Sequence, residues 1–179
     1  TDLVFDPEDA HLLHVVTQDP LRREVAKKVI TNLVVTKQIN PESIERQVET
    51  AQTDLMNELR RTGEKVVGSL HIGWMHPDLL KIIGRLKYRT SYGQNVLNHS
   101  VEVADIAGML ASELGLNVKI AKRAGLLHDI GKAIDREVDG THVELGVKIA
   151  EAYNEDPQVI NSIASHHGDV EVTTPIAHL

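Results

Sequence analysis

The sequence predicts an α+β fold, in which a small β-β-α module precedes an all-α domain. Two short apolar runs, Leu3–Phe5 and Leu12–Val16, flank the turn-forming segment Asp6-Pro7-Glu8-Asp9, as in a hairpin. From His76 onward, apolar residues recur at helical spacing between repeated helix-start signals. A chain of 179 residues is long enough for a small module and one larger domain.

The predicted hairpin leads into two helices. Asp19-Pro20 provides an N-cap and a first-turn proline, and the helix is expected to end near Val34. Asn40-Pro41 begins a second helix, which is expected to end near Arg61. Three following glycines are expected to interrupt any longer element: Gly63, Gly68 and Gly73. We therefore interpret residues 36–75 as a connecting helix and linker.

Cap signals divide residues 76–179 into consecutive helices. Ser91-x-x-Gln94 and Thr141-x-x-Glu144 are typical of capping boxes, and Asn117 and Asp156-Pro157 mark two further starts. Glycines mark the expected ends: Gly115, Gly131 and Gly168. The sequence therefore predicts an all-α domain in this part of the chain.

Composition excludes several classes of protein. There is no cysteine, which rules out disulfides and thiolate metal sites. A net charge of −7 argues against a protein that coats nucleic acid non-specifically, and 3% aromatic residues disfavour an extended base-stacking platform. No apolar run reaches the ~18 residues that span a bilayer. Because the first residue is Thr1 rather than methionine, we interpret the sequence as part of a longer chain.

Histidines carry the main chemical signal, with ten in the chain. Five of them are expected on the apolar faces of four consecutive helices: His99, His128, His142, His166 and His167. The inward row expected around the first of these is Val96, His99, Val103, Ile106 and Leu110. One buried histidine is usually an ordinary core residue with satisfied nitrogens, but five beside the carboxylate of Asp129 indicate a shared metal partner. Imidazole and carboxylate donors suit Mn, Fe, Zn or similar divalent ions.

This donor set exceeds the needs of one ion. Two ions about 3.5–4 Å apart, bridged by Asp129, would make a hydrolytic site that attacks phosphorus with a metal-activated hydroxide. Lys132, one turn after His128, is expected to reach a substrate phosphate oxygen, although a cation that complements a helix C-terminus is an alternative interpretation. Without cysteine or a Gly-x-Ser-x-Gly motif, covalent catalysis is the poorer hypothesis.

Three segments resemble the HD superfamily of metal-dependent phosphohydrolases and, within it, the ribonuclease Y family of bacterial endoribonucleases. They are Arg89-Thr-Ser-Tyr-Gly-Gln-Asn-Val-Leu-Asn-His99, Ala124-Gly-Leu-Leu-His-Asp-Ile-Gly-Lys132 and Asn161-Ser-Ile-Ala-Ser-His-His-Gly-Asp169. The resemblance implies that residues 1–35 are the C-terminal part of a KH RNA-binding domain and that residues 76–179 are an HD domain truncated at its C-terminus. It places the KH Gly-x-x-Gly loop before Thr1 and a final aspartate ligand after Leu179.

The resemblance also implies a ligand scheme with two divalent ions, which could be Mn, Mg, Zn or Fe. The first ion would be held by His99, His128 and Asp129, the last of these bridging. The second would be held by His142, His166 and His167, and Lys132 would steady the scissile phosphate. The implied activity is internal hydrolysis of single-stranded RNA that initiates mRNA decay. The resemblance also implies a homodimer and contacts with other RNA-decay enzymes. It further implies an N-terminal membrane segment outside this chain, which would hold the protein at the cytoplasmic face of the bacterial cell membrane.

Two alternatives remain open at this level. An HD phosphodiesterase acting on cyclic dinucleotides or nucleotides would use the same ligands, although a β-β-α module is expected only for an RNA-binding enzyme. A helical scaffold with a structural metal would instead enclose one ion with four protein ligands.

Overall fold

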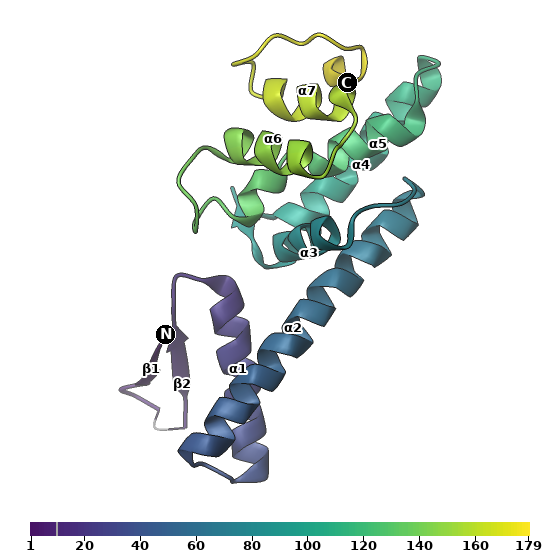
Figure 1. The fold of residues 1–179 in the computed structure, drawn as a ribbon. Coiled ribbons are helices and arrows are strands. Elements are labelled where there is room, and N and C mark those ends of the chain that lie inside the picture. The colour runs from purple at the N-terminus through teal and green to yellow at the C-terminus, as the bar shows by residue number, and fades with distance from the viewer. Residues whose placement is uncertain (10) are drawn as a thin grey trace. The chain divides into compact units, whose positions relative to one another are not determined.

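The computed structural model describes residues 1–9 and 11–179. These residues form two compact units, Thr1–Glu58 and Leu59–Leu179. A two-stranded sheet and a helix open the first unit, and helices make up most of the second (Figure 1). The predicted α+β fold is therefore confirmed.

The N-terminal hairpin forms as the sequence predicts. Strands β1 (Asp2–Phe5) and β2 (Leu13–Val16) are antiparallel, and their connection includes Ala10, which lies outside the described residues. The carboxylate of Asp6 accepts backbone hydrogen bonds from the next turn and lies 2.8 Å from the His14 ring. This is the turn chemistry that the local sequence indicates.

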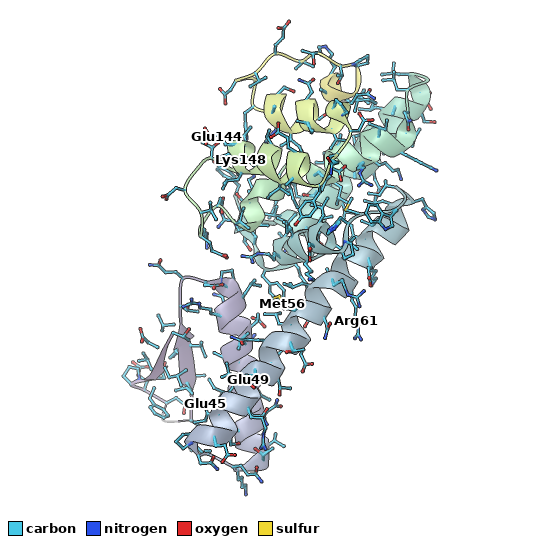
Figure 2. The ribbon with its side chains drawn as sticks, viewed as in Figure 1. Glu45, Glu49, Met56, Arg61, Glu144 and Lys148 are labelled. Atoms are coloured by element: carbon cyan, nitrogen blue, oxygen red, sulfur yellow. The ribbon has the colours of Figure 1, made fainter. Side chains whose placement is uncertain are left out.

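Helix α1 (Pro20–Thr36) and the first part of helix α2 (Pro41–Leu70) complete the first unit. Helix α1 begins at the predicted cap, where the Asp19 side chain accepts from two backbone amides. It packs on the start of α2 through Val29, Leu33 and Ala51. Most charged residues of α2 are exposed, as Figure 2 shows for Glu45 and Glu49.

The predicted end of α2 near Arg61 is wrong, because the helix continues to Leu70 through two glycines. Their role is tertiary. A Cβ at Gly63 would lie 2.2 Å from the backbone oxygen of Leu80 in α3 (Pro77–Arg85). In return, a Cβ at Gly84 of α3 would lie 2.1 Å from the backbone oxygen of Leu59. Glycine permits this close helix contact, which outweighs its cost in helix propensity.

A short hairpin stands where the sequence predicted a helix start at Ser91. After the 3₁₀ turn η1 (Leu86–Tyr88), strands β3 (Thr90–Ser91) and β4 (Gln94–Asn95) pair antiparallel. Tyr92 and Gly93 connect them with φ angles of 49° and 79°. Positive φ at both central residues is the type I′ turn, so Ser91 faces Gln94 across a hairpin and not within a helical turn.

Helix α4 (Val96–Glu113) consequently starts later than predicted, with Asn95 as its N-cap. The expected inward row is also partly wrong, because Ile106 and Leu110 are exposed. The buried face consists mostly of small residues: Ser100, Ala104, Ala107, Gly108 and Ala111. These let α5 (Val118–Leu127) pack closely, and a Cβ on Gly125 would lie 2.8 Å from the Cα of Ala104.

The remaining helices follow their predicted signals. Asn117 caps α5, Thr141 and Glu144 form the capping box of α6 (His142–Ala152), and Asp156 caps α7 (Pro157–Ser165). Helix α5 ends at Leu127 instead of Gly131, and the 3₁₀ turn η2 (Ile130–Ala133) follows. A last 3₁₀ turn, η3 (Ile176–His178), closes the chain. Within the described ranges, no helix combines the length and apolarity required to cross a membrane.

A buried ion pair joins α5 to the loop after α6. Arg123 donates from Nη2 to Glu155 Oε1 at 2.7 Å, and its Nε bonds the other carboxylate oxygen. Only 3% of the Glu155 side chain is exposed. The same guanidinium also donates to the backbone oxygen of Trp74 at 2.9 Å, which fixes the loop between α2 and α3.

Arg123→Met is expected to destabilise the fold by about 3–5 kcal/mol, because it leaves a buried carboxylate without its cation. Urea unfolding followed by circular dichroism measures the loss. Arg123→Met/Glu155→Leu removes both charges and is expected to recover most of the stability. A loss below about 1 kcal/mol in the single variant would show that the pair is dispensable.

Candidate metal centre

Helix ends bring the predicted site residues together. His99 lies in the first turn of α4, His142 is the first residue of α6, and His128 directly follows α5. His166 and His167 directly follow α7. The structure groups these residues into two sets of potential ligands: His99, His128 and Asp129, and His142, His166 and His167. Within each set, one donor atom from every residue lies within 4.8 Å of the others.

Asp129 lies between the two sets, and its side chain is 3% exposed. Its Oδ2 is 3.2 Å from His128 Nε2 and 3.9 Å from His99 Nε2. Its Oδ1 is 3.6 Å from His142 Nε2 and 3.7 Å from His166 Nε2. Each carboxylate oxygen therefore faces a different histidine set, which is the arrangement of a bridging ligand.

The three histidines of the second set lie close to one another. His142 Nε2 and His167 Nε2 are 3.0 Å apart, a distance at which one nitrogen carries a proton and the other accepts it, or both bind a cation. The ring centroids of His166 and His167 are 4.2 Å apart. His128 links the two sets, because its ring centroid is 5.3 Å from that of His166.

Backbone carbonyls orient two of the imidazoles. His128 Nδ1 donates to the Gly125 oxygen, and His166 Nδ1 donates to the Ile163 oxygen, each at 2.8 Å. A proton on Nδ1 leaves the lone pair of Nε2 free. In both rings Nε2 is the atom that faces Asp129. Metal-binding histidines commonly make this same contact between one ring nitrogen and a carbonyl oxygen, which fixes the other nitrogen for the ion.

The donor atoms fit a cation. Asp129 Oδ1 and His166 Nε2 are buried without any hydrogen-bond partner among the described residues. Two facing acceptor atoms left unpaired in the interior cost free energy unless a ligand satisfies them. A divalent ion would bind both, since it accepts a carboxylate and a neutral imidazole as ligands.

The charges around the site favour binding of a divalent ion. Burial opposes ionisation of Asp129, but the neighbouring side chains of His128, His166 and Lys132 outweigh it and hold the pKa of Asp129 well below its usual range. Burial also lowers the pKa of His99 and of His142. Metal binding requires an ionised carboxylate and neutral imidazoles, and these pKa shifts favour that state at Asp129, His99 and His142.

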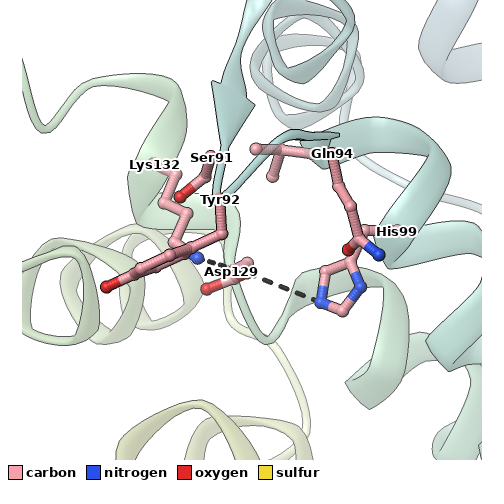
Figure 3. Close-up of a pocket in the computed structure, with 7 residues that line it drawn as sticks. Ser91, Tyr92, Gln94, His99, Asp129 and Lys132 are labelled. Carbon is pink, nitrogen blue, oxygen red and sulfur yellow. Dashed lines mark hydrogen bonds and ion pairs between the residues drawn. The ribbon is translucent and has the colours of Figure 1, made fainter.

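Lys132 and a short hairpin border the same centre. Lys132 Nζ donates to Asp129 Oδ2 at 2.7 Å, so its ammonium lies beside the buried carboxylate. A pocket of about 160 Å³ opens here, lined in part by Ser91, Tyr92 and Gln94 (Figure 3). Sequence reasoning missed these three residues because it assigned them to a helix start. The Tyr92-Gly93 turn was the signal that could have revealed them.

The other histidines lie outside both sets. His76 caps α3 by accepting from the Asp78 amide at 3.2 Å, and His14 pairs with Asp6.

Comparisons with known proteins agree with this geometry. The family model described as the HD domain matches residues 96–178, and an HD domain implies divalent-metal binding. The histidine and aspartate groups described above could hold such an ion. The chain is also homologous to ribonuclease Y. It is 60% identical to ribonuclease Y 2 of Levilactobacillus brevis over 179 residues, which covers 100% of this chain and 34% of that protein. The expected family resemblance is therefore confirmed.

Other relatives give the same result. Ribonuclease Y of Finegoldia magna is 57% identical over 172 residues, covering 96% of this chain and 33% of the relative. Ribonuclease Y of Staphylococcus epidermidis is 56% identical over 161 residues, covering 90% and 31%. The chain thus spans about a third of the length of these relatives. No solved structure matches it significantly.

Proposed function

We propose that the protein is a metal-dependent endoribonuclease that hydrolyses phosphodiester bonds in single-stranded RNA and initiates mRNA decay. The observation that carries the proposal is the position of the Asp129 carboxylate, which faces one histidine set with Oδ2 and the other with Oδ1. Such a bridge is characteristic of two-metal hydrolytic sites. The names of the relatives supply the substrate, because each is called a ribonuclease.

In this proposal His99, His128 and Asp129 hold one ion, and the other set holds the second: His142, His166 and His167. Mn, Mg, Zn or Fe would be accepted by these donors. When bound, the ions supply Lewis-acid polarisation of the phosphate and a water of lowered pKa. The protein's own contribution is to keep Asp129 ionised, and to fix the Nε2 atoms of His128 and His166 through backbone carbonyls.

Lys132 has a separate role in the proposed reaction. Its ammonium lines the pocket and is held by Asp129 Oδ2. From there it donates to a non-bridging phosphate oxygen, whose negative charge grows in the transition state. Donors aimed at developing charge in a water-poor site lower the barrier strongly.

Lys132→Met is expected to lower kcat about 10²–10³-fold with little change in metal content, since the apolar stem is kept and one transition-state donor is lost. Single-turnover cleavage of a labelled RNA and metal analysis of the same samples measure both quantities. Lys148→Met, on the exposed face of α6, is the matched control. Loss of metal in Lys132→Met would instead assign the ammonium to holding Asp129.

The first unit supports the choice of RNA. Its antiparallel hairpin and following helix are elements expected of the partial KH domain that we propose for residues 1–35. A connecting helix and linker over residues 36–75 would follow it. An RNA-binding module has no purpose in an enzyme for cyclic dinucleotides. The HD domain then takes up residues 76–179. A homodimer, association with other RNA-decay enzymes and attachment to the membrane through a segment outside this chain complete the proposal.

The test compares substrates side by side. Full-length protein is incubated with Mn²⁺ or Mg²⁺ and either a single-stranded RNA or a cyclic dinucleotide. We expect internal RNA fragments, complete inhibition by a chelator and restoration by added metal. Turnover of the cyclic dinucleotide with intact RNA would replace the proposal by the small-molecule alternative. One bound ion per chain without hydrolysis would indicate a structural metal site.

A further inference from the structure

The β3–β4 hairpin borders the metal centre but belongs to neither ligand set. Ser91, Tyr92 and Gln94 line one part of the pocket, while His99 and Asp129 line another. Figure 3 shows Tyr92 and His99 on opposite sides of Asp129. A molecule bound in this pocket with a phosphate at Asp129 therefore lies beside the tip of this hairpin.

The hairpin is anchored at its base and free at its tip. Arg89 Nη2 donates to Asp135 Oδ2 at 2.8 Å, and Asn95 Nδ2 donates to the backbone oxygen of Lys87 at 2.7 Å. The tip residue Tyr92 is fully exposed, at 101%. Its position relative to the pocket is thus set by the hairpin and not by packing of the ring.

Tyrosine is a costly choice at this position. The Tyr92 φ of 49° lies in the left-handed region, which a bulky side chain adopts at an energetic cost. Type I′ turns prefer Asn-Gly or Asp-Gly at these two positions. The ring of Tyr92 is exposed, so its burial does not offset the backbone strain. We therefore interpret the strained tyrosine as a sign of a functional contact.

The volume of the pocket limits which part of a substrate can be bound inside it. Its volume of about 160 Å³ is roughly half of the ~300 Å³ at which pockets begin to enclose whole organic ligands. A phosphate group fits beside Asp129 and Lys132, but an attached base does not. The base must lie at the rim, where the phenol ring of Tyr92 offers a free face.

We propose that Tyr92 is a substrate-binding residue that stacks on one unpaired base next to the scissile phosphate. Ser91 and Gln94 supply polar contacts to the sugar and phosphate of the same nucleotide. This inference rests on the proposed function and adds to it a reason for single-stranded substrates, since a base paired in a duplex cannot lie flat on the ring. Stacking accepts every base, so it adds affinity without sequence specificity. A single ring also agrees with an aromatic content too low for an extended platform.

The test uses Tyr92→Asn, which removes the ring but provides the residue that the turn prefers. We expect kcat/KM for single-stranded RNA to fall by about tenfold or more, mainly through KM, as alanine scans of base-stacking aromatics show. The thermal midpoint is expected to stay equal or rise. A fall in both activity and stability would instead assign Tyr92 a structural role. Tyr92→Phe keeps the ring and is expected to retain wild-type kcat/KM.

A modified substrate isolates the stacking contact. In an RNA with one mapped cleavage site, each flanking nucleotide is replaced in turn by an abasic one. At one of the two positions we expect the wild type to lose about the same factor, and Tyr92→Asn to lose nothing further. Independent losses at both positions would overturn the inference.

Trp74→Ala is the matched control, because Trp74 is 76% exposed and does not line the pocket. It is expected to leave RNA cleavage unchanged. Equal cleavage by Tyr92→Asn and wild type would overturn only the stacking inference. Absence of RNA cleavage by the wild type would overturn the proposed function and this inference with it.

Discussion

Asp129→Asn is expected to release both metal ions and to lower RNA cleavage by at least about 10³-fold. The amide keeps the shape of the side chain but removes the charge that faces both histidine sets. Two-metal sites stabilise phosphoryl transfer by several kcal/mol, and each 1.36 kcal/mol is worth a factor of about ten. A ligand to only one ion would have a smaller effect on metal content.

Metal analysis and thermal unfolding measure the outcome without relying on activity. Added Mn²⁺ is expected to raise the thermal midpoint of the wild type by mass action and to leave that of Asp129→Asn unchanged. Asp105→Asn, which removes an exposed carboxylate from α4, is the matched control and is expected to behave as wild type. Retention of both ions by Asp129→Asn would exclude a bridging role.

Gly131→Ala is expected to destabilise the protein by about 3 kcal/mol and to disrupt the second ligand set. A Cβ at Gly131 would lie 1.9 Å from the backbone oxygen of His142 and 2.8 Å from the backbone nitrogen of Gly146. Backbone atoms cannot rotate away, so η2 must separate from α6. That movement pulls His142 away from Asp129.

A graded glycine series checks this prediction by urea unfolding and Mn²⁺ titration. At Gly146 the nearest atom is a methyl group of Ile163 at 2.9 Å, which can move, so Gly146→Ala is expected to cost less. A Cβ at Gly68 in α2 would meet nothing within 4 Å, and Gly68→Ala is expected to stabilise the helix by up to ~1 kcal/mol. Equal stability for all three variants would contradict the close approach of η2 to α6.

Local signals in the sequence were sufficient for much of the fold. The Asp19 cap, the capping box at Thr141 and Glu144, and the Asp156 cap all form as predicted. Each depends on a side chain and a backbone amide two or three residues away, so tertiary context has little influence on them. The N-terminal hairpin was predictable for the same reason.

Predictions failed where distant residues decide the local structure. Gly63 does not end α2 because Leu80 packs against it, and α4 buries Ala104 instead of Ile106 because α5 approaches closely. Neither contact has a signature within the surrounding residues. The turn at Tyr92 was missed because a tyrosine is unusual in a type I′ turn.

The sequence by itself determined the set of donors: five histidines and one aspartate, at or beside the ends of predicted helices. Only the tertiary structure decided which histidines face the same carboxylate oxygen of Asp129. It also placed the Tyr92 hairpin beside them. The physical reason is distance along the chain. His99 and Asp129 are brought within 3.9 Å by the packing of α4 against α5, and helix packing depends on side chains throughout both elements.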